Sequence, residues 1–228
     1  MTPLIEIKNL SAYYENKEIF SSLNFCVEEG DYLCIIGENG SGKTTLMRLL
    51  LGFKLKKSGS IILNGITRKE IGYLPQKTET ERDFPASVNE VIMSGFASKG
   101  FFGLGYTAEQ KAAALKNMEM LEIEGLKNRS FKELSGGQQQ KVLLCRGLLA
   151  AGKAILLDEP ANSLDKASQE EFYAILKKLN QSGLAIIMIS HDIDRALFEG
   201  KHILHISENG YFYGSTDEYR KSEFGGEG

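Results

Sequence analysis

The sequence feature that most constrains the fold is a glycine-rich stretch, Gly37-Glu38-Asn39-Gly40-Ser41-Gly42-Lys43-Thr44-Thr45, which fits the pattern G-x-x-x-x-G-K-[ST]. The apolar run 32–36 before it is typical of a buried strand, and the run 46–51 after it is typical of a helix. Glycines let backbone N–H groups close around phosphates, and the helix N-terminus then faces the anion. We expect Lys43 to reach the β- and γ-phosphates of a nucleotide and the Thr44 hydroxyl to ligate Mg²⁺. An ordinary glycine-rich turn is the alternative, and the flanking strand and helix disfavour it.

Size and charge are those of one α/β domain without a nucleic-acid-binding surface. The chain has 228 residues, of which 42% are hydrophobic and 25% are charged, and its net charge is −3. The three cysteines (Cys26, Cys34 and Cys145) are scattered, as expected of reduced intracellular thiols. We expect no signal peptide, and no apolar run approaches the roughly 18 residues that span a bilayer. Any membrane role would therefore be carried by a partner.

Strand-like segments with ligand candidates near their ends precede and follow the glycine-rich stretch. Alternation predicts half-exposed strands at 4–8 and 23–27, with Tyr13 and Tyr14 between them. Tyrosines before a phosphate loop are either packing residues or candidates for stacking on a purine, and spacing alone leaves both open. Residues 58–65 predict a turn, a strand and a second turn, and residues 71–74 predict a strand that ends near Gln76. Ligands sit at the C-terminal ends of strands in α/β sheets, so Gln76 is a candidate site residue.

The middle of the chain is predicted to be helical. Thr107 and Gln110 have the spacing of a capping box, and an amphipathic run follows them. The preceding segment 95–105 is expected to be an irregular loop. Its aromatic residues Phe96, Phe101 and Phe102 are either pieces of the core or part of a partner-binding surface.

A second helix start lies at Leu134-Ser135-Gly136-Gly137-Gln138. Ser135 and Gln138 again have capping-box spacing, so this helix begins with N–H groups that need partners. Two glycines at such a terminus would let an anion approach closely. A capped helix with no ligand is the alternative, and spacing alone does not separate the two.

Two carboxylates end the apolar run 154–157, which is typical of a central parallel strand. Asp158 suits Mg²⁺, directly or through water, and Glu159 suits a general base for water. The next buried strand is predicted at 184–189 after a helix near 167–181, and it ends beside His191. We expect His191 at the same strand-end edge as Gln76 and Glu159.

The last part of the chain is predicted to form an edge hairpin over 203–213, followed by a loose tail. His202 and His205 fall in this strand, where residues three apart point to opposite faces. We therefore expect no metal site there.

These motifs together resemble those of the ATP-binding subunits of ABC transporters, and the resemblance covers nearly the whole chain. They read GENGSGKTT, LSGGQ at 134–138 and ILLDEP at 155–160, and a helical insert precedes LSGGQ. The implied fold is an α/β P-loop NTPase (RecA-like) core with an N-terminal antiparallel β-subdomain and an inserted α-helical subdomain. The single domain 1–228 would comprise a core at about 1–85 and 151–228 and a helical part at about 86–150.

The resemblance also implies roles by position. Tyr14 matches the aromatic residue that stacks on adenine. Glu159 matches the catalytic base, and His191 matches the residue that contacts the γ-phosphate. Gln76 matches a residue that touches Mg²⁺ or the attacking water and senses the membrane subunit, and Asp165 matches the loop that communicates across a dimer. The remaining nucleotide contacts are implied for Gly37, Asn39, Gly40, Ser41, Gly42, Lys43, Thr44 and Thr45, and for Ser135, Gly136, Gly137 and Gln138. Lys43 counts among the catalytic residues, and Thr44, Gln76 and Asp158 form the implied Mg²⁺ set.

Partners follow from the same resemblance. ATP and Mg²⁺ would bind, and a second copy would pack head to tail so that its Ser135 and Gly137 bind the γ-phosphate. Transmembrane permease subunits would hold the protein on the inner face of the cell membrane, together with an extracytoplasmic metal-binding protein. Residues 80–95 resemble the corresponding segment of zinc- and manganese-uptake systems. An iron-chelate importer and a soluble ATPase of an assembly scaffold are the alternatives.

Overall fold

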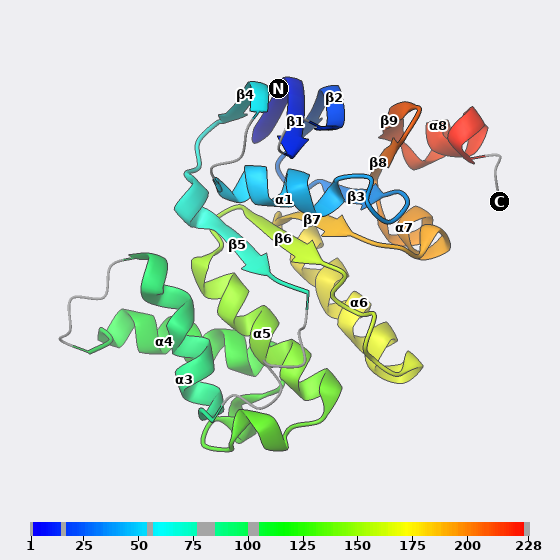
Figure 1. Ribbon diagram of the computed structural model, residues 1–228. Helices are drawn as coiled ribbons and strands as arrows, with labels where there is room; N and C mark the ends of the chain where they lie inside the picture. Colours follow the sequence, from blue (N-terminus) through cyan, green and yellow to red (C-terminus); the bar gives the residue numbers. More distant parts are fainter. Residues whose placement is uncertain (1, 15–16, 54–56, 77–84, 100–104, 226–228) are drawn as a thin grey trace. The chain divides into compact units, whose positions relative to one another are not determined.

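The computed structural model describes residues 2–14, 17–53, 57–76, 85–99 and 105–225 (Figure 1). Contacts between residues divide the chain into a first unit of residues 1–68 and 179–228 and a second unit of residues 69–178. The first unit therefore joins the two ends of the chain. The boundaries at about 86 and 150 for a helical part remain a prediction.

An antiparallel sheet of the first unit has the strand order β2-β1-β4. It contains β1 (Ile5–Tyr14), β2 (Lys17–Val27) and β4 (Lys57–Leu63). The strands predicted at 4–8 and 23–27 are present, but both are longer than alternation indicates. Register shifts interrupt β1 after Ile7, and Asn9 has a positive φ of 48°. Such bulges break the two-residue period, which hides the continuation of a strand.

The first unit also holds four strands in the order β7-β3-β8-β9. Their bounds are β3 (Tyr32–Ile36), β7 (Ala185–Ile189), β8 (His202–Ser207) and β9 (Gly210–Ser215). β3 pairs in parallel with β7 and β8, whereas β9 is antiparallel to β8. Every residue of β3 and β7 is buried, which explains their continuous apolar sequences. The parallel pairing brings the C-terminal ends of β3 and β7 to one edge.

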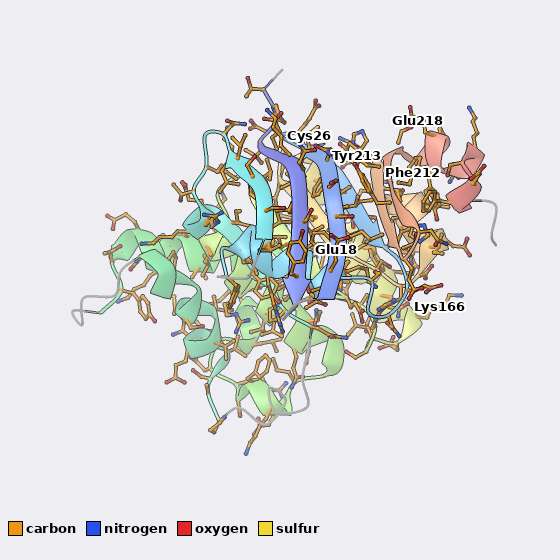
Figure 2. The ribbon with its side chains drawn as sticks, turned by 45° about the horizontal axis from the view of Figure 1, so that its top comes forward. Glu18, Cys26, Lys166, Phe212, Tyr213 and Glu218 are labelled. Carbon is orange, nitrogen blue, oxygen red and sulfur yellow. The ribbon has the colours of Figure 1, made fainter. Side chains whose placement is uncertain are left out.

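Helices α1 (Lys43–Leu51) and α7 (Ile193–Glu199) begin shortly after the ends of β3 and β7. Figure 2 shows Cys26 of β2 close to Tyr213 of β9, and the Tyr213 hydroxyl donates to the Cys26 carbonyl oxygen at 2.7 Å. The antiparallel sheet is thereby linked to the edge of the parallel strands within the first unit.

The loose tail predicted after the hairpin is wrong for residues 216–225. They form α8 (Thr216–Lys221) and a 3-10 turn, η5 (Glu223–Gly225). Ser215 and Glu218 form a capping box at the start of α8, and Tyr219 is buried at 1% exposure. This capping box was a readable signal that the composition of the tail obscured.

The second unit contains the parallel strands β5 (Ile71–Leu74) and β6 (Ala154–Asp158), and its other described elements are helices. The α-helices are α3 (Val88–Met93), α4 (Ala108–Met120), α5 (Gly136–Ala150) and α6 (Lys166–Gln181), of which α6 runs three residues past the unit. The 3-10 helices are η1 (Arg68–Glu70), which begins one residue before the unit, η2 (Ser94–Lys99), η3 (Glu124–Leu126) and η4 (Phe131–Glu133). The capping boxes predicted at Thr107 and Ser135 are confirmed.

Residues 95–99 of the aromatic segment before α4 belong to η2, where an irregular loop was predicted. Phe96 is buried at 6% exposure, and its ring centroid lies 6.3 Å from that of Tyr106. Phe96 therefore belongs to the core of the second unit, while Phe101 and Phe102 lie outside the described residues. Across the described part of the chain, no helix combines the length and apolarity needed to cross a bilayer.

Candidate nucleotide-binding and hydrolysis site

The phosphate loop follows β3 in a conformation that requires glycine. Gly42, the residue before α1, has φ 99°, in the left-handed region that favours glycine. A Cβ atom on Gly42 would lie 2.6 Å from Ile19 Cγ2 and 2.8 Å from Phe20 Cδ1. Both backbone geometry and packing against β2 therefore exclude a side chain at this position.

Lys43 is held inside the loop that it terminates. Its side chain is buried at 6% exposure, and Nζ donates hydrogen bonds to the carbonyl oxygens of Gly37 at 2.8 Å and Glu38 at 2.7 Å. A buried ammonium group needs such partners, since desolvation of an unpaired charge is costly. The bonds fix the ammonium group against the loop where a nucleotide phosphate is expected.

The loop and the start of α1 suit an anion. Gly42 has no side chain to cap α1, and the first turn of this helix has no acidic residue. The positive end of the dipole of α1 is therefore not balanced by a negatively charged side chain of that turn. The buried Ser41 Oγ atom has no hydrogen-bond partner among the described residues. Thr44 is exposed in this first turn. These features fit a polyphosphate, and the Thr44 hydroxyl is an oxygen ligand of the kind that Mg²⁺ prefers.

Two clefts within the first unit flank the phosphate loop. One has a volume of about 730 Å³ and lies between the loop, residues Glu18–Ser21 and the β8–β9 turn. The other has a volume of about 930 Å³, and Glu38, Asn39 and His191 are among its lining residues. Because β3 and β7 are parallel, His191 comes to the strand-end edge that carries the phosphate loop. The sequence predicts His191 at the same edge as Gln76 and Glu159, which belong to the second unit, so that placement stays a prediction.

The proposed adenine contact falls at the end of β1. Tyr14 pairs with Lys17 at the tip of the β1–β2 hairpin, and Tyr13 pairs with Glu18. The Tyr14 side chain lies outside what the structure describes. Stacking of Tyr14 on adenine therefore stays a prediction.

The two carboxylates of the second unit end β6 as predicted. Asp158 is the last residue of the strand and is buried at 5% exposure. Glu159 follows with φ 46°, a left-handed conformation that is uncommon outside glycine and that clusters at functional sites. The turn therefore holds Glu159 in a specific, strained orientation.

Gln76 and Glu159 are brought together across the parallel pair of β5 and β6. Leu74 pairs with Leu157, so both strands end at the same edge. Gln76 Nε2 donates to Glu159 Oε2 at 2.8 Å, over a separation of 83 residues. The same oxygen accepts a second hydrogen bond from Asn162 Nδ2 at 2.6 Å. Asn162 is a site residue that the sequence analysis does not identify, because no local pattern connects an asparagine in this segment with the Glu159 carboxylate.

The LSGGQ motif forms the start of α5 in the second unit. The Gln138 N–H donates to Ser135 Oγ at 3.3 Å, and the Ser135 N–H donates to Gln138 Oε1 at 3.1 Å. Gly136 has room beside it, since its nearest neighbour is Leu164 Cδ2 at 3.8 Å from a hypothetical Cβ atom. The capping role of Ser135 is thus established, and its contact with a nucleotide stays a prediction.

Asp165 caps the start of α6. Its Oδ1 atom accepts from the Ser168 N–H at 3.1 Å, and its Oδ2 atom accepts from the Ser168 hydroxyl at 2.7 Å. These hydrogen bonds hold the pKa of the Asp165 carboxyl below its ordinary value. The carboxylate therefore has a local structural role, while its predicted role across a dimer stays a prediction.

His202 and His205 have separate partners in the first unit. His202 Nδ1 lies 2.8 Å from Asp31 Oδ1, whereas His205 Nδ1 lies 2.9 Å from the Tyr219 hydroxyl. Within the described ranges, no group of three His, Cys, Asp or Glu side chains could hold a metal ion. The two histidines thus stabilise different parts of the unit.

A buried parallel strand, a glycine loop and a helix that opens with Lys43-Thr44 define a P-loop nucleotide-binding protein. Residues 20–162 match the family model described as ABC transporter, so the chain belongs to this family. It is an ATP-binding and ATP-hydrolysing subunit of the ABC type, as its motifs predict.

Curated relatives share most of their length with this chain. The zinc uptake system ATP-binding protein ZurA of Listeria innocua is 34% identical, and the match covers 96% of this chain and 89% of the relative. The manganese transport system ATP-binding protein MntB of Halalkalibacterium halodurans is 31% identical, and the match covers 86% of this chain and 79% of that relative. The ergothioneine transport ATP-binding protein EgtV of Helicobacter pylori is 33% identical, and the match covers 86% of this chain and 93% of that relative.

Solved structures share the fold. An ABC transporter assigned to the metal-chelate type, in an inward-facing conformation, superimposes with a TM-score of 0.87 and 29% identity, over 98% of this chain and 87% of that chain. The α/β P-loop fold predicted from the sequence is thereby confirmed.

Proposed function

We propose that this chain couples hydrolysis of Mg·ATP to transport of a metal ion of the zinc or manganese type. The observation that carries the chemistry is the hydrogen bond between Gln76 Nε2 and Glu159 Oε2 at 2.8 Å. It joins the expected general base to the segment that, by resemblance, senses a membrane subunit. The names of the zinc and manganese relatives support the cargo.

Each residue of the site has a distinct task in this proposal. Lys43 and the loop N–H groups bind the β- and γ-phosphates, and Tyr14 stacks on adenine. Glu159 takes a proton from the attacking water, and His191 contacts the γ-phosphate. Thr44, Gln76 and Asp158 would hold Mg²⁺, which neutralises charge on the phosphates.

A second copy of the chain completes the site. Its Ser135 and Gly137 would contact the γ-phosphate from the other side, since a helix N-terminus suits an anion. ATP adds contacts in the closed dimer that are missing in the open one, so it favours closure by that difference. Loss of the γ-phosphate removes these contacts and reopens the dimer.

Transmembrane permease subunits would receive this motion. The chain would sit on the inner face of the membrane through them, and an extracytoplasmic metal-binding protein would deliver the ion. The ion itself would not touch this chain. Relatives of similar identity are named for zinc, manganese and ergothioneine, which fits a cargo chosen by the partners.

An iron-chelate importer is the second candidate, supported by the structural similarity to a transporter of the metal-chelate type. Transport by the permease in proteoliposomes separates the two. ATP-dependent uptake of zinc or manganese supports the proposal, whereas uptake of only a ferric chelate contradicts the assignment of the transported ion. A soluble acceptor complex in place of a permease would overturn transport altogether.

The Glu159→Gln variant tests the chemistry. It should bind ATP as the unaltered chain does and hydrolyse it about 10²- to 10⁴-fold more slowly, the range for a general base. The matched control is Glu119→Gln on an exposed face of α4, which should hydrolyse ATP normally. Near-normal turnover by Glu159→Gln would assign the base to another residue.

A further inference from the structure

Asn162 holds the same carboxylate oxygen that Gln76 holds, but it does so from the segment that carries Glu159 itself. Its Nδ2 atom donates to Glu159 Oε2 at 2.6 Å. This is a charge-assisted hydrogen bond, which is stronger than one between neutral groups. From this geometry we propose that Asn162 is a positioning residue that orients the Glu159 carboxylate for proton abstraction. The inference rests on Glu159 being the general base, as in the proposed function.

The backbone between the two residues supports this role. Glu159 is in the left-handed region at φ 46°, which disfavours a residue with a side chain. The Asn162 N–H donates to the Glu159 carbonyl oxygen at 3.4 Å, while its amide group donates to the Glu159 side chain. Asn162 thus contacts both the main chain and the carboxylate of the strained residue. Fixing Oε2 also fixes the direction of Oε1, because the carboxylate is planar.

The turn that carries Asn162 is itself braced. Gln169 Nε2 of α6 donates to the carbonyl oxygens of Ala161 at 3.1 Å and Leu164 at 3.2 Å. The Leu164 N–H also donates to the Ala161 carbonyl oxygen at 3.1 Å. Asn162 lies between these anchored positions. A side chain on a braced turn can hold a catalytic group to within a fraction of an ångström, which loose loops do not achieve.

The hydrogen bonds from Asn162 and Gln76 to Glu159 would respond differently to a movement of the segment that carries Gln76. Gln76 follows β5, far from Glu159 in sequence, so a shift of its segment would release Oε2. Asn162 is only three residues from Glu159 and remains with it during such a shift. Asn162 therefore preserves the orientation of the base when Gln76 moves toward other ligands. The competing explanation is that Asn162 only stabilises the turn.

Steady-state hydrolysis of Mg·ATP by the full chain separates these explanations. Asn162→Ala should lower kcat about 10- to 100-fold, as expected for loss of a hydrogen bond to a charged group, and should leave KM within about twofold. Asn162→Ser retains a shorter donor and should recover part of kcat. Asn128→Ala, on an exposed turn of the second unit, is the control and should hydrolyse ATP normally.

A double variant gives the decisive readout. In the Glu159→Gln background, Asn162→Ala should cause no further loss of kcat, because the group that it orients no longer acts as a base. Full additivity of the two losses, or kcat of Asn162→Ala within twofold of the unaltered chain, would overturn the positioning role. If the unaltered chain and Glu159→Gln hydrolyse ATP equally, the proposed function falls and this inference falls with it. If those two differ as expected and only the Asn162 result is negative, the inference alone fails.

Discussion

A Cβ atom on Gly137 would lie 2.9 Å from the Ser168 hydroxyl oxygen, so the LSGGQ helix start packs directly against the first turn of α6. The same hydroxyl donates to Asp165 Oδ2 at 2.7 Å. The absence of a side chain at Gly137 thereby leaves room for the Ser168 hydroxyl to donate to the carboxylate that caps α6. The signature motif and the Asp165 turn are thus one packed element of the second unit.

Replacing Gly137 by alanine should destabilise the protein through this contact. The matched control is Gly136→Ala, where the nearest atom is 3.8 Å away and only helix propensity changes. Alanine stabilises a helix by roughly 0.5–1 kcal/mol over glycine, whereas overpacking costs about 1–3 kcal/mol. We expect the free energy of unfolding of Gly137→Ala to be about 1–2 kcal/mol below that of Gly136→Ala in urea titrations. Equal free energies of unfolding for the two variants would show that the Ser168 side chain moves away from the new methyl group without cost.

Lys43→Ala should separate ligand binding from folding. The variant loses a charged contact with two phosphates, each worth about 1.5–3 kcal/mol, so ATP affinity by calorimetry should fall about 100-fold or more. Stability should fall by only about 1 kcal/mol, since Glu38 is exposed and Gly37 is half-buried, so that water can solvate their carbonyl oxygens once the side chain is removed. Lys116→Ala on the exposed face of α4 should change neither quantity. Unchanged ATP affinity of Lys43→Ala would refute the assignment of this loop.

Ser135 and Thr107 are N-cap residues of the same kind, because each forms a capping box with a glutamine three residues later. Each forms a capping box, so Ser135→Ala and Thr107→Ala should each lower the free energy of unfolding by about 1 kcal/mol. If Ser135 also contacts the nucleotide of a second copy, only Ser135→Ala should weaken ATP-driven dimerisation. Analytical ultracentrifugation in the Glu159→Gln background measures this. Equal dimerisation of the two variants would limit Ser135 to its capping role.

The cap of α6 should respond to acid. Hydrogen bonds from Ser168 lower the pKa of Asp165 from the ordinary value of 3.8, so the folded state favours the ionised carboxylate. This contribution to stability is present above pH about 4 and is lost as pH falls through the lowered folded pKa. As pH falls below about 4, Asp165→Asn should therefore lose less stability than the unaltered chain. An unchanged pH slope in Asp165→Asn would contradict this.

The cysteines should differ in reactivity toward an alkylating reagent. Burial raises the pKa of Cys145 to about 12, and burial together with the carboxylates of Glu199 and Asp31 raises the pKa of Cys34 well above its ordinary range. Both stay thiols near pH 8, while only Cys26 is partly exposed. Mass spectrometry after brief treatment with iodoacetamide should therefore find label only on Cys26. In urea all three should react, and rapid native labelling of Cys34 would contradict its burial.

Local signals account for what could be predicted. The glycine loop, the buried strands and the capping boxes at Thr107 and Ser135 depend on residues close in sequence, so their spacing is readable. Two local features differ from the prediction. Bulges interrupt the alternation of β1, so the strand is longer than its pattern indicates, and a capping box at Ser215 starts a helix where a loose tail is predicted.

Contacts between distant segments required the structure. The sequence identified Gln76 and Glu159 separately, but only the pairing of β5 with β6 brings Gln76 Nε2 to Glu159 Oε2. Whether Phe96 lies in the core or on the surface was likewise open until its packing against Tyr106 was seen.

The sequence by itself determined which groups can bind phosphate and accept a proton, because residue type and local spacing define that chemistry. The tertiary structure decided how those groups are oriented, since Asn162 and Gln76 converge on one carboxylate oxygen only after the chain has folded. Orientation depends on strand register and turn geometry, which no short stretch of sequence specifies.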